Sequence, residues 1–123
     1  MAKTAKIAPP YSLIFVSDSE GGDTPECSPP APYWATPSCI AVGCLMYQDG
    51  DTEVRLGHAH EVNPGSRPIY DGLLETPNRK VNIETAEAEL VLQADVPSES
   101  TRVRIWTNAL REPDRIIVGL GQD

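Results

Sequence analysis

Carboxylates crowd one early stretch of the chain, and they are the side chains best suited to bind a cation or a basic partner. From Ser17 to Trp34 the stretch reads SDSEGGDTPECSPPAPYW, with acids, glycines and prolines but no base. We predict a long acidic Pro/Gly-rich loop over residues 17–33 that contacts a partner; a solvated tether is the simpler interpretation. The predicted contact residues are Asp18, Glu20, Asp23, Glu26 and Trp34.

The same acids could bind calcium, as could Asp49, Asp51 and Glu53, which alternate near a turn. Neither group matches the twelve-residue calcium loop, which needs a glycine and a final glutamate at fixed offsets. Solvated acids in turns are the more common arrangement. We therefore predict no calcium loop here.

Histidine and cysteine side chains could hold a transition metal, and the chain has two histidines and three cysteines. His58 and His60 lie two apart, so on a strand they would share a face. Cys39 and Cys44 lie five apart, which places them on opposite faces of a strand and does not match structural zinc sites. We predict no metal site and no cofactor, although the sequence leaves open whether the histidines or the acidic turns bind a metal.

Motifs for nucleophilic catalysis and phosphate binding are absent from the sequence. It has no Gly-x-Ser-x-Gly elbow and no cysteine-protease signature, and GLGQD is too short to be a phosphate loop that opens a helix. Two histidines also provide few general bases near neutral pH. We predict a protein that is not an enzyme and has no catalytic residues.

The overall charge restricts the kind of partner. Eighteen acids and ten bases give a net charge of −8 at pH 7. A negative field repels nucleic acids and anionic membranes and favours a basic protein, although many proteins are acidic for solubility alone. We predict a basic protein partner, no nucleic acid and no membrane.

Length and composition indicate one domain over residues 1–123. Residues 1–11 have too short an apolar run for a secretory signal and predict a flexible N-terminus. Without a signal, an odd number of cysteines is expected to consist of reduced thiols, which indicates a cytoplasmic location. The oligomeric state does not follow from the sequence.

Apolar residues recur at every second position, which is the period of a half-buried strand. In TRVRIWTN, for example, Val103 and Ile105 alternate with Arg102, Arg104 and Trp106. About eight such segments separated by turns predict an all-β fold, an antiparallel β-sandwich. The segments are SLIFV (12–16), CIAVGCLMY (39–47), DTEVRLGHAH (51–60), IYDGLL (69–74), KVNIET (80–85), AELVLQADV (88–96), TRVRIWTN (101–108) and RIIVGL (115–120).

Three local patterns refine this prediction. Asp49-Gly50 predicts a hairpin between the segments 39–47 and 51–60. ETAEAELVLQA has helical propensity, but its apolar residues are consecutive, so we predict a strand there. Arg102, Arg104 and Trp106 would share an exposed face, which at this net charge favours a partner-binding or simply amphipathic surface over a base-stacking platform.

Taken in order, several segments resemble the competence protein J family, small acidic proteins that inhibit a DNA-entry nuclease. They are SLIFV, the loop ending in PPAPYW, AVGCLMY, TEVRLG, VNIET, LQADVP and RVRIW. The likeness covers most of the length in spacing and residue type, but the segment after Trp34 is short and RIIVGLG ends abruptly. The resemblance implies a β-sandwich that blocks a nuclease by direct contact, and it carries over no functional residues.

We therefore predict a non-enzymatic acidic binding protein that inhibits a basic partner such as a nuclease. The alternatives are a calcium- or carbohydrate-binding β-sandwich module and a small structural protein. In a carbohydrate site, Tyr33, Trp34 or Trp106 would pack against the sugar.

Overall fold

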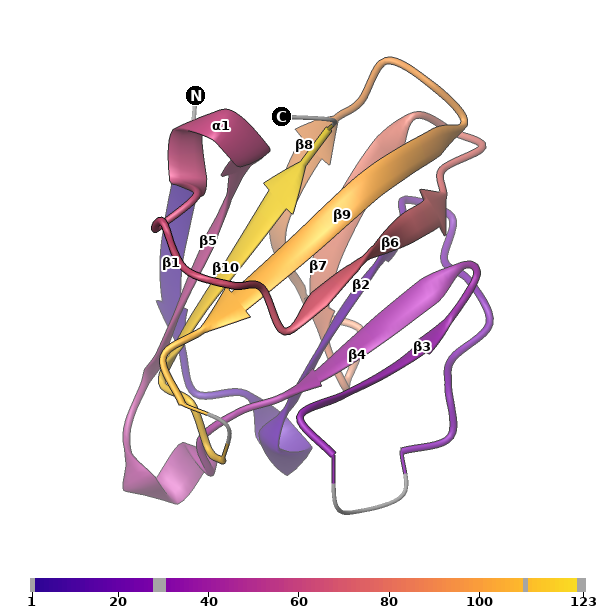
Figure 1. The fold of residues 1–123 in the computed structure, drawn as a ribbon. Helices are drawn as coiled ribbons and strands as arrows, with labels where there is room; N and C mark the ends of the chain where they lie inside the picture. The colour runs from indigo at the N-terminus through magenta and orange to yellow at the C-terminus, as the bar shows by residue number, and fades with distance from the viewer. Residues whose placement is uncertain (1, 28–30, 110, 122–123) are drawn as a thin grey trace.

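The described part of the chain contains ten strands. They form two sheets, and Figure 1 shows these sheets facing each other. The computed structural model describes residues 2–27, 31–109 and 111–121. Paired strands within these residues are antiparallel, except that β5 and β10 run parallel. The predicted all-β sandwich is confirmed.

Each sheet has five strands. In spatial order, the first contains β1 (Lys3–Ile7), β5 (Thr52–His58), β10 (Arg115–Leu120), β9 (Ser100–Thr107) and β6 (Tyr70–Glu75). The second contains β3 (Tyr33–Thr36), β4 (Cys39–Gly43), β2 (Leu13–Asp18), β7 (Lys80–Thr85) and β8 (Leu90–Asp95). The same residues include three short helices, η1 (Pro10–Ser12), η2 (Tyr47–Asp49) and α1 (Ala59–Val62). None of these helices has the length and apolar character needed to cross a bilayer.

Alternate apolar side chains from both sheets fill the space between them. Ile14 and Val16 of β2 are fully buried, as are Val103 and Ile105 of β9. Removing each such side chain from water contributes about 1.5–3 kcal/mol. The period of two seen in the sequence is therefore the pattern of one core between two sheets. Other fully buried members are Ile40, Val42, Val54, Leu56, Leu74, Val81, Ile83, Ile116 and Val118.

All eight predicted segments contain a strand, and the sequence pattern missed β1 and β3. Residues 1–11 were expected to be flexible, but β1 lies within them and pairs with β5. Its sequence KTAKI carries lysines, which are common on edge strands and leave little apolar alternation to detect. β3 has four residues and follows a proline-rich stretch, so its pattern is also too short to stand out.

The predicted Asp49-Gly50 hairpin does not form. β4 belongs to the second sheet and β5 to the first, so the chain crosses between the sheets through η2. Gly50 adopts a φ of 135°, which suits glycine. The prediction was wrong because β4 and β5 lie in different sheets, and the apolar face of each strand packs toward the opposite sheet. β5 pairs instead with β1 and β10.

A short helix packs on the outer face of the first sheet, against β5 and β10. α1 follows β5 directly, and its Ala59 and Val62 are buried. Trp106, on this outer face, is 2% exposed and donates its Nε1–H to the Ser66 carbonyl oxygen at 2.9 Å. The Arg104 guanidinium lies 6.0 Å from the centroid of the Trp106 ring. The expectation that this tryptophan is exposed was therefore wrong, because the segment that includes α1 and Ser66 covers its ring.

Gly119→Ala tests how closely α1 packs on the sheet. An added Cβ would lie 2.8 Å from Cζ3 of Trp106 and 3.0 Å from Cα of Ala59. We expect the free energy of unfolding to fall by about 1–3 kcal/mol, because overpacking forces the helix away from the sheet. Urea denaturation followed by circular dichroism measures this loss.

The control for this variant is Gly43→Ala. Its Cβ would have no close neighbour nearer than a backbone carbonyl oxygen at 3.7 Å, and its backbone is not left-handed. An equal loss of stability in both variants would contradict the close approach of α1.

Candidate binding site

Asp18 has a structural role within the sandwich. It is 1% exposed. Its Oδ1 accepts the Asn78 backbone N–H at 2.9 Å, and its Oδ2 accepts the Asn78 Nδ2–H at 2.6 Å and the Glu20 backbone N–H at 3.0 Å. Burial raises the pKa of Asp18, but the hydrogen bonds from Asn78, Glu20 and Lys80 outweigh burial and hold that pKa below its ordinary value. The carboxylate therefore joins β2 to the turn before β7 and is not placed to contact a partner.

The described part of the acidic loop lies along the β3–β4 hairpin. The Asp23 backbone N–H donates to Ser38 Oγ at 2.8 Å, and the Thr36 hydroxyl donates to the Asp23 carbonyl oxygen at 2.6 Å. Gly22 approaches the Ser38 carbonyl so closely that any added Cβ would overlap it. This part of the loop is therefore held on the hairpin and is not a free tether. Residues 28–30 of the predicted loop lie outside the described residues.

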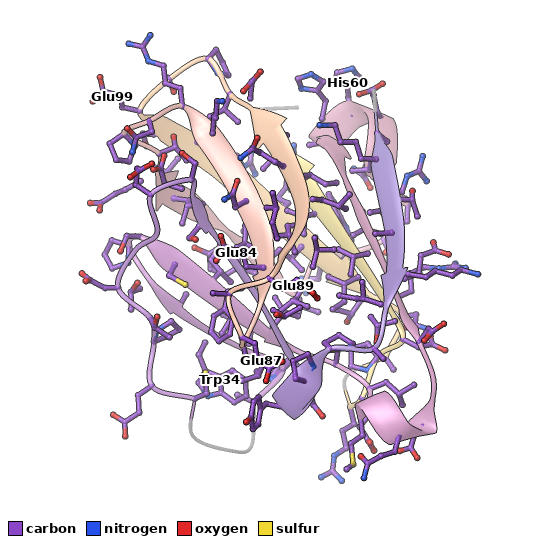
Figure 2. The ribbon with its side chains drawn as sticks, turned by 180° about the vertical axis from the view of Figure 1, so that it is seen from behind. Trp34, His60, Glu84, Glu87, Glu89 and Glu99 are labelled. Carbon is purple, nitrogen blue, oxygen red and sulfur yellow. The ribbon has the colours of Figure 1, made fainter. Side chains whose placement is uncertain are left out.

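The predicted contact residues are spread along the sandwich. Figure 2 shows Trp34 at one end of the molecule and Glu99 at the other. Asp18 lies toward the Glu99 end, because it binds Asn78, and the next residue, Arg79, pairs with Glu99 at 3.8 Å. The five predicted residues thus do not form a single surface. The exposed acids among them are Glu20, Asp23 and Glu26.

An open hollow of about 570 Å³ lies at the Trp34 end, and sequence reasoning did not identify it. It is bordered by η1, the start of β3, the end of β4 and the loop between β9 and β10. Its volume is within the range of known ligand pockets, roughly 300–1,000 Å³. The walls are mostly apolar and include Tyr11, Leu13, Pro32, Trp34, Gly43 and Pro113.

Three residues around this hollow have left-handed backbone conformations. The φ angles are 61° at Tyr11, 58° at Ser12 and 46° at Glu112. Such conformations are uncommon outside glycine, asparagine and aspartate, and each costs on the order of 1–3 kcal/mol. Strain of this kind tends to gather at functional sites, so it marks the hollow as the candidate site.

A second hollow, of about 420 Å³, adjoins the first. Tyr11 and Ser12 line both hollows. The second is completed by Pro10, Met46, Gln48 and Glu87. Figure 2 shows Glu87 and Trp34 toward the same end of the molecule.

One exposed carboxylate lines each of the two hollows, and two more lie next to lining residues in the sequence. Glu112 lines the first and Glu87 lines the second, while Glu26 and Asp49 each adjoin a lining residue in the sequence. Arg111 is the base that lines the first hollow. This end of the described surface is therefore both apolar and acidic.

Two of the thiols, those of Cys39 and Cys44, are buried, and the two histidine rings lie side by side. Burial raises the pKa of Cys39 to about 11 and that of Cys44 to about 12, so both thiols are protonated and weakly nucleophilic near neutral pH. His58 ends β5 and His60 lies in α1, with their ring centroids 5.7 Å apart. Among the described residues, no group of three or more His, Cys, Asp or Glu is placed to hold a metal ion.

Comparison with known proteins relates this chain to one solved structure at the level of the fold. No family model matches the chain, and no curated protein matches it. The solved structure named "Crocagin biosynthetic gene J" is 16% identical with a TM-score of 0.55, and the match covers 100% of this chain and 99% of that one. The match shows that the two proteins share a fold. At this identity it assigns no site residue to this chain.

Asp18→Asn tests the hydrogen-bonded carboxylate. Because the pKa of Asp18 is lowered from its ordinary 3.8 in the folded protein, the ionised carboxylate stabilises the fold above that pH. This contribution is lost as the pH falls from there through the folded-state pKa. We expect the variant to lose about 1–3 kcal/mol at neutral pH and to show a flatter decline of stability in acid. Thermal unfolding as a function of pH measures both effects.

Asp23→Asn is the matched control, because the Asp23 side chain is exposed. Its stability should stay within about 0.5 kcal/mol of the unmodified protein. An Asp18→Asn variant as stable as this control at every pH would contradict the structural role of the carboxylate.

Proposed function

We propose that this protein is a non-enzymatic binding protein that engages a basic protein partner through the acidic end of the sandwich. The observation that carries this proposal is the open hollow of about 570 Å³ with aromatic and proline walls. Its position among exposed carboxylates gives a partner both apolar area to bury and charges to match. These are the requirements of recognition, and they involve no chemical step.

The two kinds of contact contribute differently. Exposed ion pairs are each worth about 0–1 kcal/mol, so the carboxylates mainly increase the rate of association and select for basic partners. The net charge of −8 acts in the same direction over longer distances. Most of the affinity would come from apolar side chains that enter the hollow.

A nuclease is one basic protein that fits this proposal. Its nucleic-acid channel is cationic, and an acidic protein surface can compete with nucleic acid for such a channel. The likeness of the sequence to the competence protein J family supports this choice and supports inhibition by direct contact. The free thiols Cys27, Cys39 and Cys44 support the predicted cytoplasmic location.

The calcium and carbohydrate alternatives have less support. Asp18 accepts N–H donors on both oxygens, and Glu53 lies 3.6 Å from an arginine of β10, so neither carboxylate is free to bind calcium. Trp106 is covered by the segment that includes α1, and the Tyr33 ring packs edge-on against another tyrosine at 5.2 Å. Of the three aromatic residues considered for a sugar, Trp34 is the one that lines the open hollow.

Neutralising the acids beside the hollows should weaken binding. The variant Glu26→Gln/Glu87→Gln/Glu112→Gln removes three charges and keeps the side-chain shapes. We expect its Kd for the partner to rise roughly tenfold at low salt and the difference to shrink as salt screens the charges. Affinity capture from the source cells, followed by calorimetry with the recovered protein, measures this change.

The matched control is Glu20→Gln/Asp23→Asn/Glu99→Gln, which removes the same number of charges away from the hollows. It should bind like the unmodified protein. Equal losses in both variants, or an acidic captured partner, would argue against the proposal. If the partner is a nuclease, the unmodified protein should also inhibit its cleavage of DNA.

A further inference from the structure

Tyr11 stands at the shared border of the two hollows. This residue is 74% exposed, and it lines both of them. An exposed aromatic ring forgoes the stabilisation that burial of its large apolar area would bring. Here the ring presents that area to whatever occupies the hollows.

We propose that the two hollows together bind one extended segment of the basic partner, with an apolar side chain in each hollow on either side of Tyr11. Lysine or arginine residues flank these two side chains in the segment. This inference rests on the proposed function and adds to it the conformation and residue pattern of the bound segment.

An extended chain can place one side chain in each of two adjoining hollows. Residues of such a chain rise about 3.3 Å each, so side chains two apart point the same way and lie roughly 6–7 Å from each other. A partner helix would instead lay a continuous apolar stripe into a continuous groove. Apart from Tyr11 and Ser12, the two hollows are lined by different residues, and two separate hollows favour the extended segment.

Backbone hydrogen bonds hold the walls of the first hollow in place. The Ser12 carbonyl oxygen accepts the Cys44 N–H at 2.9 Å, which ties η1 to the residue after β4. The Pro113 carbonyl oxygen accepts the Leu45 N–H at 2.9 Å, which ties the β9–β10 loop to the same stretch. Because these walls are fixed before a partner binds, little ordering of the protein opposes association.

The backbone strain supports a role for the Tyr11 ring itself. Glycine or asparagine would relieve a left-handed φ such as its 61°. A tyrosine at this position therefore reduces stability without burying its ring. Binding of a partner segment accounts for that arrangement, since the ring then gains apolar contacts on both sides.

Charges at the two hollows indicate the flanking residues of the segment. Glu112 lines the first hollow together with Arg111, and Glu87 lines the second; all three residues are exposed. A cationic side chain next to each apolar residue would lie beside one of these carboxylates. Met46, which is 44% exposed in the second hollow, has a flexible side chain that adapts to different apolar groups.

Two synthetic peptides with blocked ends test this pattern on the whole protein. KLTLKR places two leucines two positions apart, whereas KLLTKR has the same composition with the leucines adjacent. In an extended chain the adjacent leucines point to opposite faces. We expect KLTLKR to bind roughly tenfold more tightly, which is the gain from burying one additional leucine. Shifts of backbone amide signals in nuclear magnetic resonance titrations give both Kd values.

Two variants locate the binding site. Gly43→Val places a side chain in the first hollow, where an added Cβ has its nearest contact at 3.7 Å. Tyr11→Asn removes the ring and suits the left-handed backbone, so its melting temperature should stay equal or rise. Each variant should abolish the preference for KLTLKR over KLLTKR.

The outcomes separate this inference from the proposed function. Equal binding of the two peptides, a preference that survives both variants, or binding of neither peptide would overturn the two-hollow site. Equal binding that weakens in the Glu26→Gln/Glu87→Gln/Glu112→Gln variant would still support an acidic binding end. If the Kd values of the peptides are unchanged when those three charges are removed, the proposed function is contradicted as well.

Discussion

Burial of alternate apolar side chains between the two sheets is the interaction on which the rest of the structure depends. Side chains such as Val16, Val103 and Ile105 are fully buried there, and they come from strands far apart in the chain. Because each strand commits one face to this core, its polar residues face outward and its connections run over the ends of the sandwich. The acidic, apolar end of the sandwich is built largely from these connections.

The hollows lie where several such connections meet. The chain crosses from β4 to β5 through η2, and η1 and the β9–β10 loop approach the same end. Tyr11, Ser12 and Glu112 adopt strained conformations there, held by a rigid sandwich on one side. A scaffold stabilised by its core can retain a few strained residues at one end, and that is where a binding site gains most from rigidity.

Local patterns succeeded where burial by the core alone decides which way a side chain points. Val103 and Ile105 face inward as their alternation predicts, and Leu90 begins a strand despite the helical propensity around it. The patterns failed where another part of the chain intervenes. Trp106 alternates as an exposed residue should, yet the segment that includes α1 covers it, and Asp18 has the residue type of a surface acid but is held by hydrogen bonds from Asn78.

The amino-acid sequence alone determined the strand period, the all-β class and the negative charge, because each depends on residue types and on neighbours within a few positions. Only the tertiary structure decided that β4 and β5 lie in different sheets and that Tyr11, Trp34 and Pro113 line one hollow. Residues that meet in this way are separated by as many as about a hundred positions in the chain, so their contacts exist only once both sheets have packed on their common core.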